Sequence, residues 1–219
     1  MFNIAIDGPS ASGKSSIAKG LAKRLNLIHI DTGAMYRTIA FACLSEGVSL
    51  DSELIYTKIS EHSDILFDQE GNIYLNDVDV SHKIRHDKIS KAASIVSQHA
   101  GVREILVKKQ QEMAKTKGFI MDGRDITSVV LPDAELKVYQ TADVNIRAKR
   151  RYEQFLDQGL DVDYDEILED LKARDYRDMN REHSPLVKVK DAFEIDTTYL
   201  NIDEVISLII NQLESRNLI

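Results

Sequence analysis

The residues best suited to chemistry lie near the start of the chain, where Gly8-Pro9-Ser10-Ala11-Ser12-Gly13-Lys14-Ser15 fits the pattern G-x-x-x-x-G-K-[ST]. An apolar segment at residues 2–6 precedes this stretch, and apolar residues at helical spacing follow it. At such a strand-to-helix turn, free backbone N–H groups and the positive end of the helix dipole bind phosphate oxygens. In this pattern Lys14 contacts the β- and γ-phosphates and the Ser15 hydroxyl ligates Mg²⁺. The sequence therefore predicts a nucleoside triphosphate site.

Two arginine-bearing helix faces are expected in the last third of the chain. Their members are Arg147, Arg150 and Arg151 on the first helix and Arg174, Asp178 and Arg181 on the second. Arginine matches phosphate oxygens with a planar fork and stays charged, so the two faces can form a clamp over phosphates. The alternative is a solvated pair of charged helices. Beside a phosphate loop, the clamp is the interpretation that we favour.

Two further polar clusters follow apolar segments. Asp122-Gly123-Arg124-Asp125 comes directly after residues 118–121, where Asp122 can order Mg²⁺ or its waters and Arg124 can hold a phosphate. The alternative for this cluster is a polar turn.

The second cluster, Asp31-Thr32-Gly33-Ala34-Met35-Tyr36-Arg37, follows another apolar segment and opens a helix. Asp31 or Thr32 is suited to cap that helix. Tyr36 and Arg37 are suited to face an acceptor substrate, and the spacing alone does not choose between these roles.

Apolar segments with strand character alternate with helical patterns along the chain. The five expected core strands are residues 2–6, 27–30, 119–121, 137–139 and 192–195. The longer helices are expected at residues 102–117, 143–157, 163–183 and 202–214. This alternation is typical of an α/β fold with a parallel sheet and helices on both faces.

One segment, about residues 61–101, breaks the alternation. Short apolar runs at 65–67, 73–76 and 77–80 are separated by the turn signals Gly71-Asn72 and Asn76-Asp77. We expect a small antiparallel insertion within a single domain of residues 1–219. The core of that domain is then about residues 1–60 and 118–219.

Composition excludes several classes of protein. The chain has 219 residues and a net charge of −8, which disfavours a broad nucleic-acid-binding surface. Its single cysteine, Cys43, permits no internal disulfide and is expected in the core. No apolar run approaches the ~20 residues of a membrane span, and no leader is expected. We expect a soluble cytoplasmic protein, with a monomer as the default.

Two weaker signals have simpler explanations. Asp68-Gln69-Glu70-Gly71 matches the D-x-x-G of GTPases, but it lies in the expected antiparallel insertion and no guanine-recognition motif accompanies it. We interpret it as a turn. His82 and His86 are four residues apart, but they lack the intervening glutamate of a zinc protease. We therefore expect no zinc site there.

Taken together, the motifs resemble those of bacterial cytidylate kinases along nearly the whole chain. The blocks that carry the resemblance are Asp7–Ser15, the Asp31-Thr32-Gly33-Ala34-Met35-Tyr36-Arg37 cluster, Lys91-Ala92-Ala93-Ser94, Val102-Arg103-Glu104, Asp122-Gly123-Arg124-Asp125 and Arg174-Asp175-Tyr176-Arg177-Asp178-Met179-Asn180-Arg181. Thr32 stands where relatives often carry serine, which keeps the hydroxyl. The resemblance implies a P-loop three-layer α/β/α fold. It also implies that the insertion binds a nucleoside monophosphate and that a helical lid lies at about residues 147–165.

The resemblance also implies an activity, the transfer of the γ-phosphate of ATP to CMP or dCMP with Mg²⁺. The ATP-binding set is then Gly8, Pro9, Ser10, Ala11, Ser12, Gly13, Lys14, Ser15 and Ser16 of the loop, with Arg150 and Arg151 of the lid. The implied catalytic set is Lys14, Asp122, Arg124, Arg147 and Arg181, and the metal ligands are Ser15 and Asp122, directly or through water.

The implied CMP-binding residues fall into three groups. Around the CMP phosphate lie Thr32, Tyr36, Arg37, Asp122 and Arg124; Ser94, Arg103 and Asp125 read cytosine; and Arg174, Asp178 and Arg181 contact the sugar hydroxyl or phosphates. A carboxylate accepts a hydrogen bond from cytosine N4, and an arginine donates to N3 or O2. Uracil presents an acceptor where cytosine has N4, so such a site disfavours it.

Two rival functions remain open at this point. One is a related small kinase that acts on UMP, dTMP, AMP or shikimate, against which the insertion and the cytosine-reading set argue. The other is a nucleotide-dependent switch that transfers no phosphate to a small acceptor.

Overall fold

A parallel sheet of five strands forms the centre of the protein in the computed structural model, which describes residues 1–48, 53–68 and 70–219. In sheet order the strands are β2 (Ile28–Asp31), β6 (Phe119–Gly123), β1 (Ile4–Asp7), β7 (Leu136–Thr141) and β8 (Phe193–Asp196). All four neighbouring pairs are parallel. The five predicted core strands are confirmed, with ends displaced by one or two residues.

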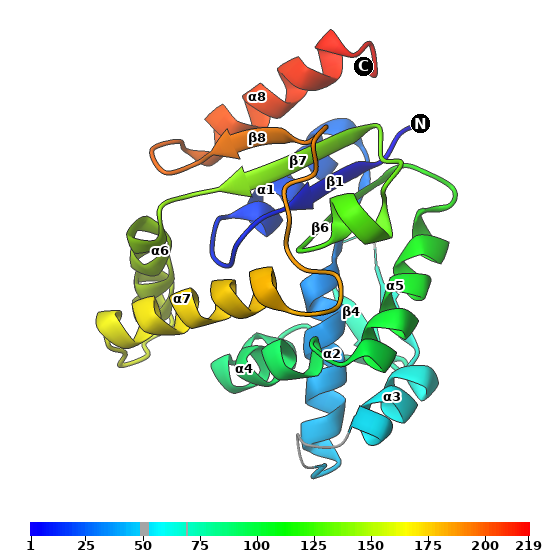
Figure 1. The fold of residues 1–219 in the computed structure, drawn as a ribbon, viewed down its shortest axis with the longest axis vertical. Helices are drawn as coiled ribbons and strands as arrows, with labels where there is room; N and C mark the ends of the chain where they lie inside the picture. Colours follow the sequence, from blue (N-terminus) through cyan, green and yellow to red (C-terminus); the bar gives the residue numbers. More distant parts are fainter. Residues whose placement is uncertain (49–52, 69) are drawn as a thin grey trace.

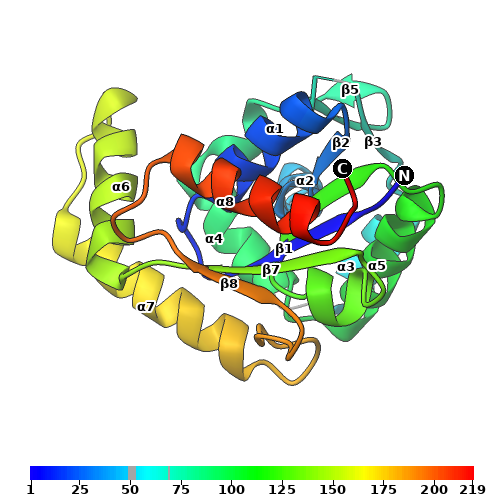
Figure 2. The same ribbon diagram turned by 90° about the horizontal axis from the view of Figure 1, so that it is seen from above.

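Helices cover both faces of this sheet, as the α/β interpretation requires. Ile4 and Ile6 of β1 pack into one hydrophobic cluster with α1 (Lys14–Leu25) and α8 (Ile202–Ser215), which lie side by side in Figure 2. Ala5, between them, packs into the opposite cluster with α2 (Thr32–Ser45) and α5 (Ala100–Ala114). This period-two alternation separates the two cores on either side of the central strand.

The predicted insertion forms a three-stranded antiparallel sheet of β3 (Ile65–Phe67), β4 (Ile73–Leu75) and β5 (Val78–Asp79). Asn76 and Asp77 turn the chain between β4 and β5 with positive φ values of 48° and 65°. The Asp68–Gly71 segment is a turn, as predicted, with Gly71 N–H donating to the Asp68 carbonyl; Gln69 lies outside the described residues.

The helix α3 (Glu53–His62) leads into the insertion, and the 3₁₀ turn Lys83–Arg85 and α4 (Asp87–Val96) follow its strands. Buried apolar residues of the insertion join the same cluster as α2 and α5 rather than forming a core of their own. The prediction of a helix at 102–117 is displaced, since α5 begins at Ala100 and ends at Ala114. The chain leaves it through Lys117 and Gly118, both with positive φ.

The arginine-bearing region forms a helical pair, α6 (Val144–Asp157) and α7 (Tyr164–Asn180), which lies at one end of the sheet in Figure 1. Asp143 and Asp163 cap the two helices by accepting hydrogen bonds from backbone N–H groups. A separate small cluster of Ala148, Phe155, Ile167 and Leu171 joins them. α7 ends three residues before the predicted boundary at 183, and the chain becomes extended at Arg181.

Two simple expectations from composition can be compared with the structure. Cys43 is fully buried and free, as predicted. Among the described residues, no helix is both long and apolar enough to cross a membrane.

Gly8 provides a sharp test of this packing. A Cβ at Gly8 would lie 1.9 Å from the Gln140 carbonyl oxygen, whereas one at Gly159 would meet nothing within 4 Å. Both glycines have positive φ, so Gly159→Ala measures the cost of backbone strain without a clash, and we expect it to lower the free energy of unfolding by about 1–2 kcal/mol. Gly8→Ala adds a backbone clash to this strain, and we expect it to lower the free energy of unfolding, measured in urea, by about 3 kcal/mol or more. Equal losses in the two variants would contradict the packing described.

Candidate active site

The site begins with the register of three neighbouring strands. β1 pairs with β6 so that Asp7 lies opposite Gly123, and β2 pairs with β6 so that Asp31 lies opposite Asp122. All three strands run in the same direction, so these residues meet at the carboxyl edge of the sheet. The phosphate loop leaves from this edge immediately after Asp7.

The phosphate loop is held in shape by its own residues and by the next strands. The Lys14 ammonium donates to the Pro9 carbonyl at 2.7 Å and to Ser12 Oγ at 3.3 Å. The Ser12 carbonyl accepts from Gln140 Nε2 and from Thr197 Oγ1. Gly13, with a φ of 92°, gives the N-terminal turn of α1 a conformation that favours glycine. The loop is therefore ordered around a buried lysine.

Burial controls the charge of that lysine. Desolvation and the neighbouring positive charge of Arg124 together lower the pKa of Lys14 to about 7, against the attraction of Asp122 and Asp7. An anion placed in the loop would favour the ammonium form. Binding of phosphate would therefore raise the pKa of Lys14 and increase the fraction of its ammonium form.

Ser15 and Asp122 lie next to each other beside the loop, as two residues that are predicted to bind the same Mg²⁺ ion must. Ser15 Oγ donates to Asp122 Oδ2 at 2.7 Å, although the two residues are 107 positions apart. Mg²⁺ prefers such oxygen donors and usually takes one or two from protein, the rest coming from phosphates and water. The described residues contain no group of three or more His, Cys, Asp or Glu that would form an all-protein metal cage. The donor set fits Mg²⁺ held together with a nucleotide.

The Asp7 carboxylate is a site residue that the sequence analysis did not single out. It is fully buried and accepts hydrogen bonds from Ile126 N, Thr127 N and Thr127 Oγ1 at 2.6–2.9 Å. Burial raises the pKa of Asp7 to about 6, against the lowering effect of these three donors. The bonds anchor the five-residue π-helix Ile126–Val130, which begins directly after Asp125. Asp7 therefore connects the phosphate loop to the predicted cytosine-reading segment.

Two of the three predicted cytosine-reading residues, Arg103 and Asp125, are in direct contact. Arg103 of α5 forms a buried ion pair with Asp125, and Arg181 Nη2 lies 3.7 Å from the other carboxylate oxygen. The Arg103 guanidinium also lies over the Tyr36 ring, 5.3 Å from its centroid. Ser94 is buried on α4, which packs against the helix α2 that carries Tyr36. Segments from four parts of the chain thus build one polar site.

In the group of predicted phosphate-binding arginines, Arg174 Nε is a buried donor without a hydrogen-bond partner among the described residues, whereas Arg37 and Arg124 are paired with carboxylates. Burial and the positive charges of Arg124, Arg37 and Arg151 together lower the pKa of Arg174 to about 10, against the attraction of Asp178. Arg124 Nε donates to Asp178 at 2.8 Å. Burial alone would raise the pKa of Asp178, but Arg124 and Arg174 outweigh it and leave the pKa below its usual value. Repulsion among the remaining cations would be relieved by a bound polyanion.

Asp31 takes the capping role that the sequence left open, whereas the acceptor-facing role of Tyr36 and Arg37 stays a prediction. Asp31 caps α2 by accepting from Ala34 N and also pairs with Arg37 at 2.7 Å. Thr32 Oγ1 donates to the Asp122 backbone carbonyl at 2.8 Å, which ties α2 to β6. Arg37 therefore belongs to the cationic group.

The three arginines of α6 have different surroundings. Arg147 pairs with Asp175 at 2.5 Å and donates to the Ser10 carbonyl, while the Ser10 N–H donates to the same carboxylate. Arg150 donates to the Thr197 carbonyl, and Arg151 lies over the Phe155 ring. Asp175, which was not among the predicted site residues, thus joins α6 and α7 to the phosphate loop.

Unpaired polar atoms mark the acceptor side of the site. Among the described residues, ten buried side-chain polar atoms lack a hydrogen-bond partner, and five of them belong to the predicted CMP-binding set: Tyr36, Ser94, Arg103, Arg174 and Arg181. Buried polar groups are normally hydrogen-bonded, and each unpaired group is destabilising. Their concentration here indicates a place for a polar ligand.

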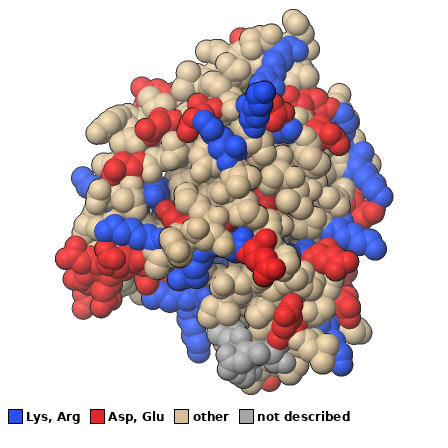
Figure 3. Space-filling view, viewed as in Figure 1, with Lys and Arg blue, Asp and Glu red and all other residues tan. Residues whose placement is uncertain are grey.

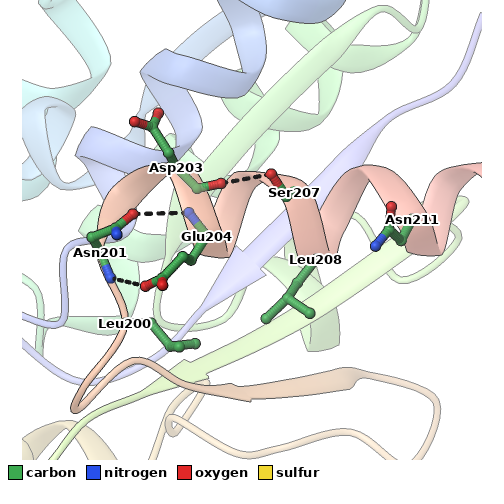
Figure 4. A pocket seen from close by; sticks show the side chains of 7 residues that line it. All are labelled: Leu200, Asn201, Asp203, Glu204, Ser207, Leu208 and Asn211. Atoms are coloured by element: carbon green, nitrogen blue, oxygen red, sulfur yellow. Dashed lines mark hydrogen bonds between the residues drawn. The ribbon is translucent and has the colours of Figure 1, made fainter.

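Two hollows elsewhere do not share this chemistry. One of about 490 Å³ lies along α8, where Asn201 and Glu204 satisfy each other in a capping box (Figure 4). Another of about 410 Å³ lies between α4 and the α6–α7 pair, and five of its ten lining residues are acidic. On the face drawn in Figure 3, the described basic and acidic side chains are interleaved. Neither hollow is suited to bind phosphate.

Comparison with known proteins agrees with the geometry. The sequence model of the family described as cytidylate kinase matches residues 4–215 of this chain. The chain belongs to the cytidylate kinase family. The cytidylate kinase of Bacillus subtilis (strain 168) is 45% identical over 219 residues, covering 99% of this chain and 98% of that protein. The cytidylate kinase of Caldanaerobacter subterraneus subsp. tengcongensis is 49% identical over 203 residues, covering 93% and 90%.

Solved structures support the fold expected of a cytidylate kinase relative. Shikimate kinase from Acinetobacter baumannii superposes with a TM-score of 0.50 and 17% identity, covering 100% of this chain and 96% of that one. An uncharacterized protein from Eubacterium ventriosum gives a TM-score of 0.54 with 16% identity, covering 98% and 99%. These likenesses confirm the P-loop α/β/α fold class.

The state of Lys14 leads to a pH prediction. With its pKa near 7 in the free protein, Lys14 is mostly neutral at pH 8, and nucleotide phosphates would raise the pKa. We expect ATP binding at pH 8 to take up about one proton, and ATP affinity to fall as the pH rises above 7. Calorimetry in two buffers of different ionisation enthalpy measures this uptake. Lys14→Met should abolish it; undiminished uptake in that variant would assign the proton to another group.

Proposed function

We propose that this chain transfers the γ-phosphate of ATP to CMP or dCMP, giving ADP and CDP or dCDP. The observation that supports this most strongly is the mutual repulsion of Arg174 with Arg37, Arg124 and Arg151, next to the buried Lys14. These cations come from five separate segments. Arg37, Arg124 and Arg151 each face one carboxylate, whereas the buried Arg174 Nε has no hydrogen-bond partner among the described residues. Two polyanionic substrates, one in the phosphate loop and one at the acceptor side, would add negative charge to this group.

The acceptor needs no general base in this reaction. A phosphate monoester is largely dianionic at neutral pH, since its second pKa is near ~6. The site therefore acts by aligning two anions and stabilising the charge of the transferred group. Lys14, Arg124, Arg147 and Arg181 supply positive charge, and the buried Arg147–Asp175 pair holds the lid against the loop. Mg²⁺, held by Ser15 and Asp122 with the nucleotide, would neutralise phosphate charge.

Two segments would complete the site around the substrates. Residues 61–101 would form the acceptor-binding insertion and residues 147–165 the lid that excludes water from the γ-phosphate. Asp87 of α4 lies 3.9 Å from Arg151 of α6, an ion pair that joins the two segments. The rest of the chain, residues 1–60 and 118–219, would be the core of the same single domain.

Cytosine recognition would rest on Asp125 with Arg103 and Ser94. Asp125 is an acceptor for cytosine N4, and the unpaired Arg103 Nε and Ser94 Oγ are available to the ring. Uracil would place its O4 acceptor against a carboxylate, which costs binding energy.

The remaining expectations belong to the same proposal. ATP and CMP or dCMP would be the partners, with no nucleic acid and no membrane, and the chain would act as a cytoplasmic monomer. The net charge of −8 supports the absence of a nucleic-acid partner.

A coupled assay of ADP production tests the function. With Mg-ATP we expect turnover with CMP and dCMP and little with UMP, AMP, dTMP or shikimate. Lys14→Ala should remove nearly all turnover while CMP affinity, measured by calorimetry without ATP, stays within about threefold. ADP production that depends on no acceptor would reject the kinase reaction, and a preference for shikimate would reassign the substrate.

Asp125→Asn tests the base specificity without deleting a buried partner. Alanine would leave Arg103 buried and unpaired, which is destabilising by about 3–5 kcal/mol. Asparagine keeps one acceptor oxygen and adds an N–H₂ donor that suits uracil O4. We expect the ratio of kcat/KM for CMP over UMP to fall by about tenfold or more. Thermal unfolding of the variant serves as the control, and an unchanged ratio would move discrimination to other residues.

A further inference from the structure

We propose that His29 is a positioning residue that fixes the orientation of the Asp122 carboxylate toward Ser15 and the Mg-nucleotide. The proposal rests on the function proposed above. His29 belongs to none of the motifs by which the sequence predicted the site. It lies on β2, two residues before Asp31, and reaches the site only because β2 pairs with β6.

The contact is short and shielded from water. His29 Nε2 lies 2.7 Å from Asp122 Oδ1, and the two side chains are 7% and 4% exposed. Asp122 has no proton to give when ionised, so Nε2 must carry the hydrogen and donate it. The charge-assisted bond is therefore made in a place where water competes poorly for either group.

The two oxygens of Asp122 have different partners. Oδ1 accepts from His29 on β2, and Oδ2 accepts from Ser15 Oγ on α1. Rotation of the carboxylate about its Cβ–Cγ bond would break both contacts together. With His29 in place, Oδ2 stays on the side of the phosphate loop, where a Mg²⁺ ion or its water is expected.

Other groups cannot replace this contact. Among the described residues, His29 is the sole cationic or potentially cationic side chain within 4.0 Å of an Asp122 carboxylate oxygen. The Thr32 hydroxyl fixes the backbone carbonyl of Asp122 and leaves its carboxylate free to rotate. Groups that orient a metal-binding carboxylate typically affect metal affinity by about 10–100-fold. The effect of His29 should therefore appear in Mg²⁺ dependence rather than in CMP binding.

The experiment compares His29→Leu, which removes the donor, with His29→Gln, which keeps an N–H donor on a side chain of similar reach. The first readout is the Mg²⁺ concentration for half-maximal kinase activity. The second is binding of Mn²⁺ to the protein–ADP complex, followed by the loss of free Mn²⁺ signal in electron paramagnetic resonance. This readout needs no acceptor and no turnover. His62→Leu, at an exposed histidine, is the matched control.

We expect His29→Leu to weaken Mn²⁺ binding and to raise the half-maximal Mg²⁺ concentration by about 10-fold or more, with KM for CMP unchanged. In both readouts His29→Gln should stay within about threefold of the parent protein, and His62→Leu should give the same values as the parent protein. Unchanged Mn²⁺ and Mg²⁺ dependence in His29→Leu would overturn the proposal. So would equal losses in the Leu and Gln variants, or a loss in CMP binding as large as the loss in metal binding, because either indicates a purely structural role.

A folding defect is controlled by a further variant. His29→Asn keeps a polar side chain but is too short to reach Asp122 Oδ1. If His29→Leu is unstable, His29→Asn takes its place in the test, and we expect the same weakening of Mn²⁺ binding. Wild-type metal dependence in a folded His29→Asn would again overturn the proposal. If the parent protein fails to phosphorylate CMP, the proposed function fails, while Mn²⁺–ADP binding still decides the role of His29.

Discussion

The parallel pairing of β2, β6 and β1 is the constraint on which the rest of the structure depends. It places Asp31, Asp122 and Asp7 at one edge of the sheet, where the phosphate loop also begins. A slip of one residue in either pairing would turn these carboxylates to the opposite face of the sheet. The alternation of Ile4, Ala5 and Ile6 between two hydrophobic cores opposes such a slip, since it would exchange isoleucine and alanine between two closely packed cores. Hydrophobic burial thus fixes the positions of the polar groups.

The site built on this edge is stable in spite of its charges. The positive charges of Arg37, Arg124 and Arg151 repel that of Arg174, and several buried donors around Asp125 have no hydrogen-bond partner among the described residues. Such groups weaken the free protein but are matched to anions and to a base with hydrogen-bonding edges. The three hydrogen bonds to Asp7 and the Arg103–Asp125 pair keep the donors in place before substrates arrive. Prior ordering of this kind is what lets electrostatic stabilisation act on the transferred phosphate without rearrangement.

The peripheral elements are attached to this edge in different ways. The insertion shares the core of α2 and α5, so the side of the site that carries Ser94 is continuous with the main hydrophobic core. The α6–α7 pair instead has its own small cluster and reaches the phosphate loop through Asp175, Arg147 and the apolar contact of Ala11. A unit joined mainly by polar contacts can shift with less loss of buried apolar area than one joined by a shared core. This difference suits the lid proposed for residues 147–165.

The sequence by itself determined the chemistry and much of the order of elements. The loop Gly8–Ser15 predicted phosphate binding, apolar runs and helical spacing predicted the five core strands and most helices, and arginine spacing predicted the faces of α6 and α7. Element ends were less well determined, because tertiary contacts decide them: α7 ends before Arg181, and the π-helix after Asp125 gave no periodic signal. Only the tertiary structure revealed Asp7, His29 and Asp175 as parts of the site, since their partners lie 119, 93 and 165 positions away. Spacing rules compare neighbours within a helix or strand, whereas these contacts arise from the order in which parallel strands are assembled and from the packing of α7 across their ends.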